Sequence, residues 1–466
     1  MTHTSQDARE PNPYEELILV DPTLQLTNVT PELQVMQGFL QHLVSGKLVL
    51  ENLKLIWMKN NPLEGLRLLY QAESPGSQRR PYYFFARTMS PKAGKEWQEK
   101  MNRQFLLDIQ KNKILSVFQK AAVYSPALGM LVQIFPADRR LPFLIPATDS
   151  EVMKPVLEHI CGDEAGKLTH VDVAVVQYKP ERKCLLRYQL HWQDSREPRT
   201  PTQSVYGKVF RKVKRVYANL ETIHQAWYNS VFQIPTPLGL VPEFRLELLS
   251  ALPGTQLSYV CGRKTFPDLC RRVARGLLDF HETPVLLNET KSLSDELLEL
   301  KAWGQDFGQS RPDEWNRIRN SIFTLEMRLL GQNRLKPKLV HGDFHVANIL
   351  VDGQRLSLLD FENCLMGNPA IDVGSFYAQL KLLALKRYQN HTALDHGVRA
   401  FLKTYIHGCS EELRAVIPTY CALSCLWCAY FQCILRPVKA GWMERAYAML
   451  ALCEQILDSG EPAGVE

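Results

Sequence analysis

The segment 339–376 constrains the fold of this chain more than any other stretch of its 466 residues. Two short apolar runs, 348–351 and 356–359, flank the dipeptide Asp352-Gly353. Both residues of that dipeptide tolerate a positive φ angle, and apolar strands on either side of such a pair are typical of a tight β-hairpin. The hairpin places the start of its first strand beside the end of its second.

Three polar residues around this hairpin suit metal-assisted phosphoryl transfer. Asn348 and Asp360 become neighbours when the hairpin forms. Amide and carboxylate oxygens are ligands that Mg²⁺ takes when phosphate and water fill its other positions. Asp343 lies on the loop before the hairpin, where it can accept a proton from an incoming hydroxyl group. The spacing therefore indicates the chemistry of a kinase.

The same segment resembles the signature of the aminoglycoside phosphotransferase and choline kinase superfamily. That signature reads His-Gly-Asp-(aromatic or Leu)-His-x-x-Asn, then an apolar strand and Asp-(Phe or Trp)-Glu, and here it runs from His341 to Glu362. The resemblance implies that Asp343 is the catalytic base and that Asn348 and Asp360 are the metal ligands. It also implies that His341 anchors the catalytic loop, and it leaves Glu362 to contact the acceptor or to support the loop.

A second motif farther along the chain supports the same resemblance. Residues 367–372, Gly-Asn-Pro-Ala-Ile-Asp, are similar to the family's Gly-Asp-Pro-x-x-Asp, with Asn368 where an Asp is usual. By this resemblance Asp372 holds the catalytic loop in place.

The resemblance implies an α+β, bilobal protein-kinase-like fold, with a β-rich small lobe at 151–256 and a helical large lobe at 257–466. Before these lobes we expect a flexible, polar lead-in at 1–30 and an extra N-terminal α+β domain at 31–150. Strand-like and helical patterns follow in the same order in this extra domain and in the small lobe, and the stretches LRLLYQ and CLLRYQL match. We therefore interpret the extra domain as a degenerate duplicate of the small lobe, in which Arg87 corresponds to Lys208.

A kinase small lobe needs a strand lysine for the nucleotide phosphates and a helix glutamate that orients it. Lys208 lies in a predicted strand, where a cation is unexpected without a partner, and the surrounding Tyr-Gly-Lys-Val-Phe is similar to the family's lysine strand. Glu221 is the acidic residue between Lys208 and Glu243, so it is the candidate partner by elimination. The alternative is a solvent-facing lysine and an exposed helix glutamate.

No phosphate loop of the G-x-G-x-x-G or G-x₄-G-K-[ST] type occurs in the small lobe. The basic turn 179–183 is the expected substitute, with Lys183 at the phosphates; an ordinary solvated hairpin is the alternative. Residues 248–253 look like the hinge whose backbone reads adenine, so Leu249 is expected to contact the nucleotide.

Composition narrows the class of protein and its compartment. The net charge of +6 gives no indication of nucleic-acid binding, although the run 208–215 is basic and fits either a solvated face or a surface that attracts phosphate. The N-terminus has neither an apolar core nor an Arg-rich amphipathic pattern, so no signal or transit peptide is predicted. Eleven cysteines without a secretion signal then indicate reduced thiols in the cytoplasm.

One cysteine cluster has two readings. Cys421, Cys425 and Cys428 have the C-x₃-C-x₂-C spacing of an iron–sulfur ligand set, but they lie in an apolar helical pattern. We interpret them as buried thiols on one helix face, because cluster ligands need a loop that wraps the metal. The uncharged stretch 415–435 is about as long as a membrane span, but Pro418 favours a core helix, so no integral span is expected.

These features predict an ATP-dependent phosphotransferase. It would use Mg²⁺ and ATP to phosphorylate a hydroxyl of a small-molecule acceptor, whether a sugar, an aminoglycoside or an amino alcohol. The sequence leaves the acceptor and the oligomeric state open. The alternative, a catalytically silent nucleotide-binding pseudokinase or regulatory module, is disfavoured by the intact Asp343, Asn348 and Asp360. A protein kinase is disfavoured by the wording of the catalytic loop and the lack of a Gly-rich loop.

Overall fold

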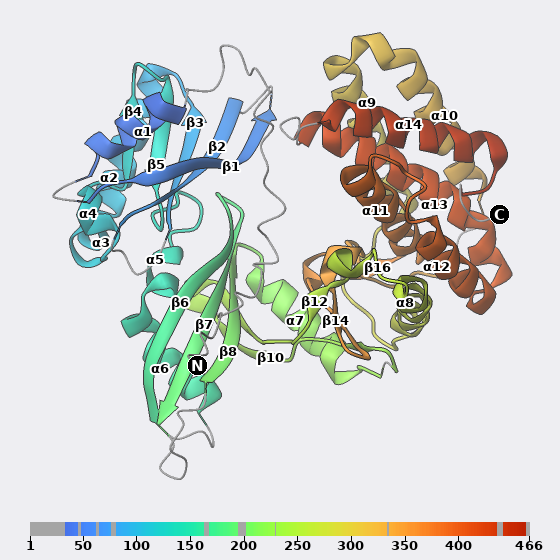
Figure 1. The fold of residues 1–466 in the computed structure, drawn as a ribbon, viewed down its shortest axis with the longest axis horizontal. Coiled ribbons are helices and arrows are strands. Elements are labelled where there is room, and N and C mark those ends of the chain that lie inside the picture. The colour runs from blue at the N-terminus through green and yellow to red at the C-terminus, as the bar shows by residue number, and fades with distance from the viewer. Residues whose placement is uncertain are drawn as a thin grey trace, which may run out of the picture.

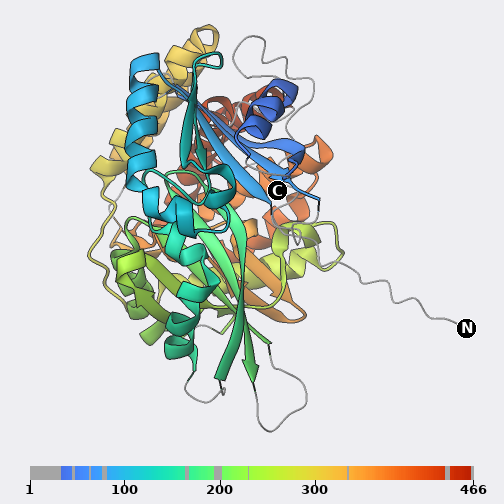
Figure 2. The same ribbon diagram turned by 90° about the vertical axis from the view of Figure 1, so that its left-hand side faces the viewer.

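The structure is a computed structural model, and it describes residues 33–44, 48–61, 65–75, 81–162, 167–193, 202–228, 230–332, 335–435 and 441–462. The lead-in predicted at 1–30 lies outside these residues. Two β-sheets occupy one side of the molecule and a helical C-terminal part occupies the other (Figure 1). In the view turned by 90°, the first sheet, in blue, stands above the second, in green (Figure 2).

The first sheet is antiparallel, with five strands in the order β1-β2-β3-β5-β4. Helices beside it enclose a hydrophobic core of its own. The strands are β1 (Glu51–Asn61), β2 (Gly65–Glu73), β3 (Tyr82–Thr88), β4 (Ala122–Ser125) and β5 (Met130–Ile134), and the helices are α1 (Leu33–His42), α2 (Pro91–Gln104), α3 (Leu106–Lys111) and α4 (Leu115–Phe118).

The sequence pattern predicts one long helix from about 92 to 120, and this prediction is wrong, because three helices, α2, α3 and α4, divide the stretch. Asn112 accounts for the last break. Its Oδ1 accepts hydrogen bonds from the backbone N–H groups of Ile114 and Leu115 at 3.0 and 3.1 Å, so its side chain begins a new turn instead of letting α3 continue.

The second sheet is also antiparallel and five-stranded, in the order β10-β11-β8-β7-β6. Counted along the chain from β6, its strands have the same spatial order as those of the first sheet. A helix, α7, follows its third strand, as α2 follows β3. The strands are β6 (Lys167–Lys179), β7 (Lys183–Gln193), β8 (Thr202–Phe210), β10 (Pro237–Val241) and β11 (Leu246–Ser250), and the helices are α5 (Leu144–Thr148), α6 (Ser150–Cys161) and α7 (Val213–Gln225).

The pairing register between the second and third strands is also the same in the two sheets. Both second strands contain Tyr-Gln, at 70–71 and at 188–189. The residue three positions before that Tyr lies opposite Arg87 in the first sheet and opposite Lys208 in the second. Arg87 and Lys208 therefore hold equivalent places, as expected of a duplicate, while the origin by duplication stays a prediction.

A third group of buried residues joins the two sheets. The first sheet and the residues after it contribute aromatic side chains, and the second sheet contributes the opposing face. The two sheets thus bury one continuous hydrophobic core between them. Its members include Leu69, Tyr83, Phe85 and Phe135 on one side and Tyr178, Leu186, Tyr188 and Leu248 on the other.

The C-terminal part is mainly helical and has a large core. The sequence pattern predicts a helix from 266 to 281, and α8 confirms both limits. Pro267 lies in its first turn, where a missing N–H costs nothing. The helices are α8 (Phe266–His281), α9 (Leu293–Ser310), α10 (Trp315–Gly331), α11 (Ala370–Tyr388), α12 (Asp395–Gly408), α13 (Glu411–Tyr430) and α14 (Trp442–Ser459).

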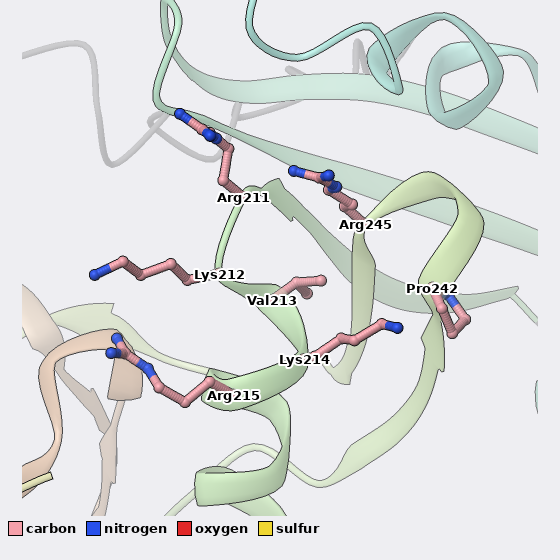
Figure 3. Close-up of a pocket in the computed structure, with 7 residues that line it drawn as sticks. All are labelled: Arg211, Lys212, Val213, Lys214, Arg215, Pro242 and Arg245. Carbon is pink, nitrogen blue, oxygen red and sulfur yellow. The ribbon is translucent and has the colours of Figure 1, made fainter.

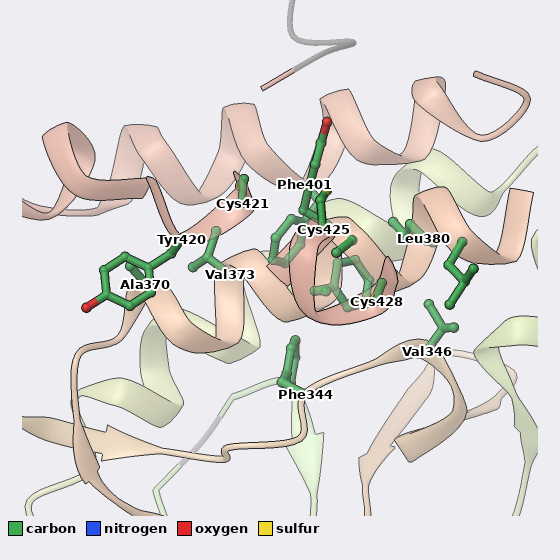
Figure 4. Packing of buried hydrophobic residues seen from close by; sticks show 14 of the residues in the cluster. Phe344, Val346, Ala370, Val373, Leu380, Phe401, Tyr420, Cys421, Cys425 and Cys428 are labelled. Atoms are coloured by element: carbon green, nitrogen blue, oxygen red, sulfur yellow. The ribbon is translucent and has the colours of Figure 1, made fainter. Parts of the chain in front are cut away.

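The cysteine-rich stretch forms α13, which packs against α11 and α14. Cys421, Cys425 and Cys428 are buried on it, with Phe344 and Phe401 in the same core (Figure 4). This confirms the reading as a buried helix, and burial raises the pKa of the Cys428 thiol to about 12. By length and composition, the helical stretch Glu411–Cys433 could cross a membrane, and 72% of its apolar window is buried within the structure.

Candidate active site

The predicted hairpin is confirmed, with its turn one residue later than expected. β14 (Ile349–Asp352) pairs with β15 (Arg355–Leu358), and the loop residues are Gly353 and Gln354. Gly353 has φ +56°, which glycine adopts without strain. Beyond the strands the pairing continues, because the N–H of Leu359 donates to the carbonyl of Asn348 at 2.8 Å. This bond makes Asn348 and Asp360 neighbours across the hairpin.

Asp372, at the start of α11, holds the catalytic loop. Its Oδ2 accepts from the backbone N–H of His341 at 2.7 Å, and its Oδ1 accepts from that of Gly342 at 2.9 Å. His281 Nε2 lies 3.1 Å from the same carboxylate. His341 in turn bonds to the carbonyl of Leu359 through Nε2 at 2.9 Å, which ties the loop to the hairpin. Both residues make the anchoring contacts expected of them.

Gly342 permits the sharp bend of this loop. Its φ is +73°, and a Cβ atom added there would lie 2.5 Å from the carbonyl oxygen of Asn363. No larger residue fits without moving the backbone. The bend brings the next residue, Asp343, to the edge of the site.

Asp343 is the candidate base, and its surroundings keep it ionised. Its Oδ1 lies 3.4 Å from His345 Nε2, and its carbonyl accepts from Asn348 Nδ2 at 2.9 Å. Partial burial raises the pKa of Asp343, but the hydrogen bond and the charge of His345 outweigh burial, so this pKa lies below its usual value. The negative charge of Asp360 also reaches Asp343. The two carboxylates therefore lie in one electrostatic environment.

Two lysines from the second sheet meet two carboxylates that follow the hairpin. Lys208 Nζ lies 2.7 Å from Asp360 Oδ1 and 2.7 Å from Glu362 Oε1. Lys183 Nζ lies 2.8 Å from Glu362 Oε1 and 3.4 Å from Asp360 Oδ2. Asp360 adopts φ +65°, a left-handed conformation that Asp tolerates better than most residues. The contacts join the second sheet to the catalytic segment.

The cluster shifts the pKa values of Lys208 and Asp360. Burial lowers the pKa of Lys208, but the charges of Asp360 and Glu362 outweigh burial and raise it above its usual value. Burial raises the pKa of Asp360, and the charges of Lys208 and Lys183 more than compensate, so this pKa lies well below its usual range. Lys208 and Asp360 are therefore both charged at neutral pH.

The ion pair expected between Lys208 and Glu221 is not formed among the residues that the structure describes. Lys208 binds Asp360 and Glu362 instead. Glu221 lies beside Tyr217 on α7, and burial together with this carboxylate raises the pKa of Tyr217 to about 12. Elimination along the sequence failed because the partners of Lys208 come from more than 150 residues away.

Sequence reasoning also missed Glu247. This residue lies directly opposite Lys208 in the neighbouring strand β11 and is 2% exposed. Burial raises the pKa of Glu247 to about 7, against the opposing charge of Lys208. The pairing register of β8 and β11 would have identified it, but the sequence alone does not supply that register.

The expected hinge connects two sheets. β11 ends at Ser250, and after residues 251–254 the chain enters β12 (Thr255–Gln256), which pairs with β14. Leu249 is half-buried near the end of β11, opposite Tyr206. Its contact with a nucleotide stays a prediction. The second sheet and the catalytic hairpin are thereby linked through a short segment.

The basic run begins at Lys208 and continues into the first turn of α7. Its exposed part, together with Arg245, surrounds a cavity of about 640 Å³. Figure 3 shows these side chains spreading around the start of α7. Arg215 pairs with Glu289. The lining residues are Arg211, Lys212, Val213, Lys214, Arg215, Pro242 and Arg245.

The donor set at the hairpin fits a magnesium ion that also binds phosphate. Asn348 uses its Nδ2 for the carbonyl of Asp343, which leaves its Oδ1 as the acceptor atom. Asp360 supplies a carboxylate with a low pKa. No group of three or more His, Cys, Asp or Glu side chains in the described part of the chain could enclose a metal ion. Phosphate and water would have to complete the coordination.

The site combines a buried strand lysine, the carboxylate that it binds after a β-hairpin, and a second Asp on an anchored loop, which is the arrangement expected of a phosphotransferase. Comparison with known proteins agrees: a model of the phosphotransferase enzyme family matches residues 210–402. The match covers 193 residues, which is less than half of the chain.

Similarity to individual proteins is more distant. A methylthioribose kinase of Bacillus velezensis is 29% identical over 162 residues, which are 33% of this chain and 38% of that protein. The chain thus matches well under half the length of this relative. Among solved structures, choline kinase of Cryptosporidium parvum is 10% identical with a TM-score of 0.46, over 68% of this chain and 99% of that one. The aminoglycoside phosphotransferase APH(4)-Ia is 13% identical with the same TM-score, over 66% and 98%.

Proposed function

We propose that this protein transfers the γ-phosphoryl group of ATP to a hydroxyl group of a small molecule. The observation that carries the proposal is the 2.7 Å ion pair between Lys208 and Asp360. It joins the lysine that would hold the nucleotide phosphates to the carboxylate of the catalytic segment. A nucleotide whose phosphates meet the strand lysine and whose metal ion meets the Asp requires these two side chains to lie close together.

Each residue then has a distinct task. Asp343, ionised beside His345, accepts the proton of the acceptor hydroxyl and orients its oxygen. Lys208 and Lys183 bind phosphate oxygens by charge. Asn348 and Asp360 would hold Mg²⁺, which when bound neutralises charge on the phosphates. Asp372 and His341 keep the loop in position.

The proposed acceptors are a sugar, an aminoglycoside or an amino alcohol. Support comes from the family match and from the similarity of part of the chain to a methylthioribose kinase. The helices α9 and α10 follow α8 and precede the catalytic segment, and we propose that they border the acceptor.

A panel of such acceptors, incubated with Mg²⁺ and ATP, tests the proposal. Acceptor-dependent ADP formation and a phosphorylated product seen by mass spectrometry are expected. The alternative, a silent nucleotide-binding module, predicts ATP binding with no acceptor-stimulated turnover. Absence of ATP binding would contradict both functions.

A further inference from the structure

A turn of the second sheet is held from outside by the first sheet. This turn, residues 179–183, connects β6 to β7 and ends at Lys183, whose Nζ reaches Glu362 and Asp360. In phosphotransferases with a Gly-rich loop, glycines let the backbone approach phosphate. The turn has no glycine, and its conformation is fixed by side chains from elsewhere.

Asp138, in the loop after β5, accepts hydrogen bonds both from the second sheet and from its own loop. Its Oδ2 accepts from the backbone N–H of Glu181 and from the hydroxyl of Tyr178, each at 2.7 Å. Its Oδ1 accepts from the N–H groups of Arg140 and Leu141 at 2.7 and 3.0 Å. Asp138 is completely buried, so these bonds are shielded from water.

Glu181 receives the complementary contacts. Its carboxylate is 2% exposed, and it lies 3.2 Å from Arg87 Nη1 and 2.8 Å from Arg139 Nε. The guanidinium of Arg139 also stacks on the ring of Trp97, 4.4 Å from its centroid. Burial raises the pKa of Glu181, but Arg139 and Arg87 outweigh burial and hold it below its usual value.

These contacts stabilise a backbone conformation that is otherwise unfavourable. Glu181 has φ +60°, which places a residue with a Cβ in the left-handed region. A buried carboxylate also needs charged partners, because desolvation is costly. Aromatic packing adds to the contact, since the rings of Phe135 and Tyr178 lie 4.9 Å apart. The turn is therefore held in this conformation by residues of the first sheet and of the loop after β5.

We propose that the first sheet and the loop after β5 preorganise the phosphate-binding turn, so that Lys183 is in place for the nucleotide phosphates before the nucleotide binds. The positioning residues are Arg87, Asp138, Arg139 and Glu181. The proposal rests on the proposed function only in naming nucleotide phosphate as the group that Lys183 meets. It gives the first sheet a role in nucleotide affinity. None of the four positioning residues needs to touch the nucleotide.

Hydrogen exchange on the intact, nucleotide-free chain tests the preorganisation directly. The amide of Glu181 is bonded to a buried carboxylate, so peptides covering 179–183 are expected to exchange slowly without nucleotide and to change little when ATP and Mg²⁺ are added. Rapid exchange that becomes slow only with ATP would overturn the proposal. This readout does not depend on turnover.

Substitutions test the link to the nucleotide. Arg139→Met is expected to raise the KM or Kd for ATP about tenfold and to leave kcat and the acceptor KM within about twofold, because a charged hydrogen bond to the turn is lost. Arg139→Lys should recover part of this affinity. The matched control is Arg140→Met, since Arg140 lies 4.0 Å from Glu181 in the same loop with its side chain 46% exposed.

The outcomes separate the two proposals. Equal ATP affinity for the Arg139 and Arg140 variants would refute the positioning role, even if the enzyme is active. A parallel fall of kcat and ATP affinity, with a lower melting temperature and no rescue by lysine, would indicate general destabilisation and also refute it. A chain that protects the turn in hydrogen exchange but binds no ATP would contradict the proposed function and confine the preorganisation to structure.

Discussion

Asp343 and Asp360 carry the same functional group but lie in different surroundings. Asp360 is bound by two lysine ammonium groups, whereas Asp343 has only His345 within ion-pair distance among the described residues. A carboxylate that must accept a proton should not be held by strong cations, because they lower its basicity. The difference in environment therefore supports the proposed role of Asp343 as the base.

Asp343→Asn is expected to lower kcat about 10²- to 10⁴-fold, because general-base catalysis contributes rate factors of that size. The affinity for ATP should change little, since Asp343 makes no contact with Lys208 or Lys183 within ion-pair distance. Steady-state kinetics and a nucleotide-binding titration measure both quantities. Asp352→Asn, at the exposed end of β14, is the control, and equal activities of the two variants would exclude Asp343 as the base.

The buried side chain of Glu247 makes the free energy of unfolding depend on pH. Its pKa is about 7 in the folded chain, above the ordinary 4.5, so the fold favours its neutral form. The contribution of Glu247 to the free energy of unfolding is fully present below about pH 4.5, and it is lost as the pH rises through about 7. Glu247→Gln is therefore expected to gain stability over the unsubstituted protein between pH 5 and 8, by on the order of 3 kcal/mol.

Urea unfolding at pH 5, 6, 7 and 8 measures this gain. The control is Glu243→Gln, at an exposed position in the short 3-10 helix Pro242–Phe244 that precedes β11. A difference in unfolding free energy between Glu247→Gln and the unsubstituted protein that stays constant with pH would show that Glu247 is ionised throughout.

At the scale of elements, the catalytic loop depends on how closely α11 and α13 approach. α11 begins with the residues around Asp372, and Gly374 lies one half-turn farther along. A Cβ added at Gly374 would lie 2.3 Å from the backbone carbonyl of Tyr420 on α13. The absence of a side chain therefore sets the distance between these helices, and through it the position of Asp372.

Gly374→Ala is expected to lower the free energy of unfolding by about 1–3 kcal/mol, because the added methyl forces the helix backbones apart. Gly38→Ala is the matched control: Gly38 is also inside a helix, α1, but a Cβ there meets no atom within 4 Å. This control should stabilise the protein by about 0.5–1 kcal/mol through helix propensity. Chemical denaturation of both variants measures the contrast, and changes of the same sign would contradict the close packing.

At the scale of the whole molecule, the shared core makes the two sheets one folding unit. Phe85 of the first sheet is 2% exposed and packs in the cluster that contains Leu186 and Tyr188 of the second. Separation of the sheets would expose both apolar faces at once. Neither sheet should therefore unfold ahead of the other.

Phe85→Ala is expected to destabilise both sheets together, by about 3–5 kcal/mol. Hydrogen exchange in increasing urea should show peptides from β3 and from β7 opening in the same transition, at a lower urea concentration than in the unsubstituted protein. A transition in which β3 opens while β7 remains protected would show that the sheets unfold independently.

Local patterns predicted much of this fold. The limits of α8, the catalytic hairpin and the helical character of the cysteine-rich stretch follow from periodicity and turn residues within a few positions of one another. The contacts of Lys208 and Glu181 did not follow, because each depends on segments far apart in the chain. Glu221 is the first acidic residue after Lys208 in the sequence, but Asp360 and Glu362 are the acidic residues that bind Lys208 in the structure.

The buried contact at Glu181 also has a consequence for related chains. In a turn without such contacts, a position with a left-handed backbone conformation favours glycine. This chain has Glu181 there, because Arg87, 94 positions earlier, and Arg139 neutralise its charge. Positions 87, 139 and 181 should accordingly vary in concert across homologues. In homologues in which an uncharged residue replaces either arginine, we expect glycine or asparagine at position 181.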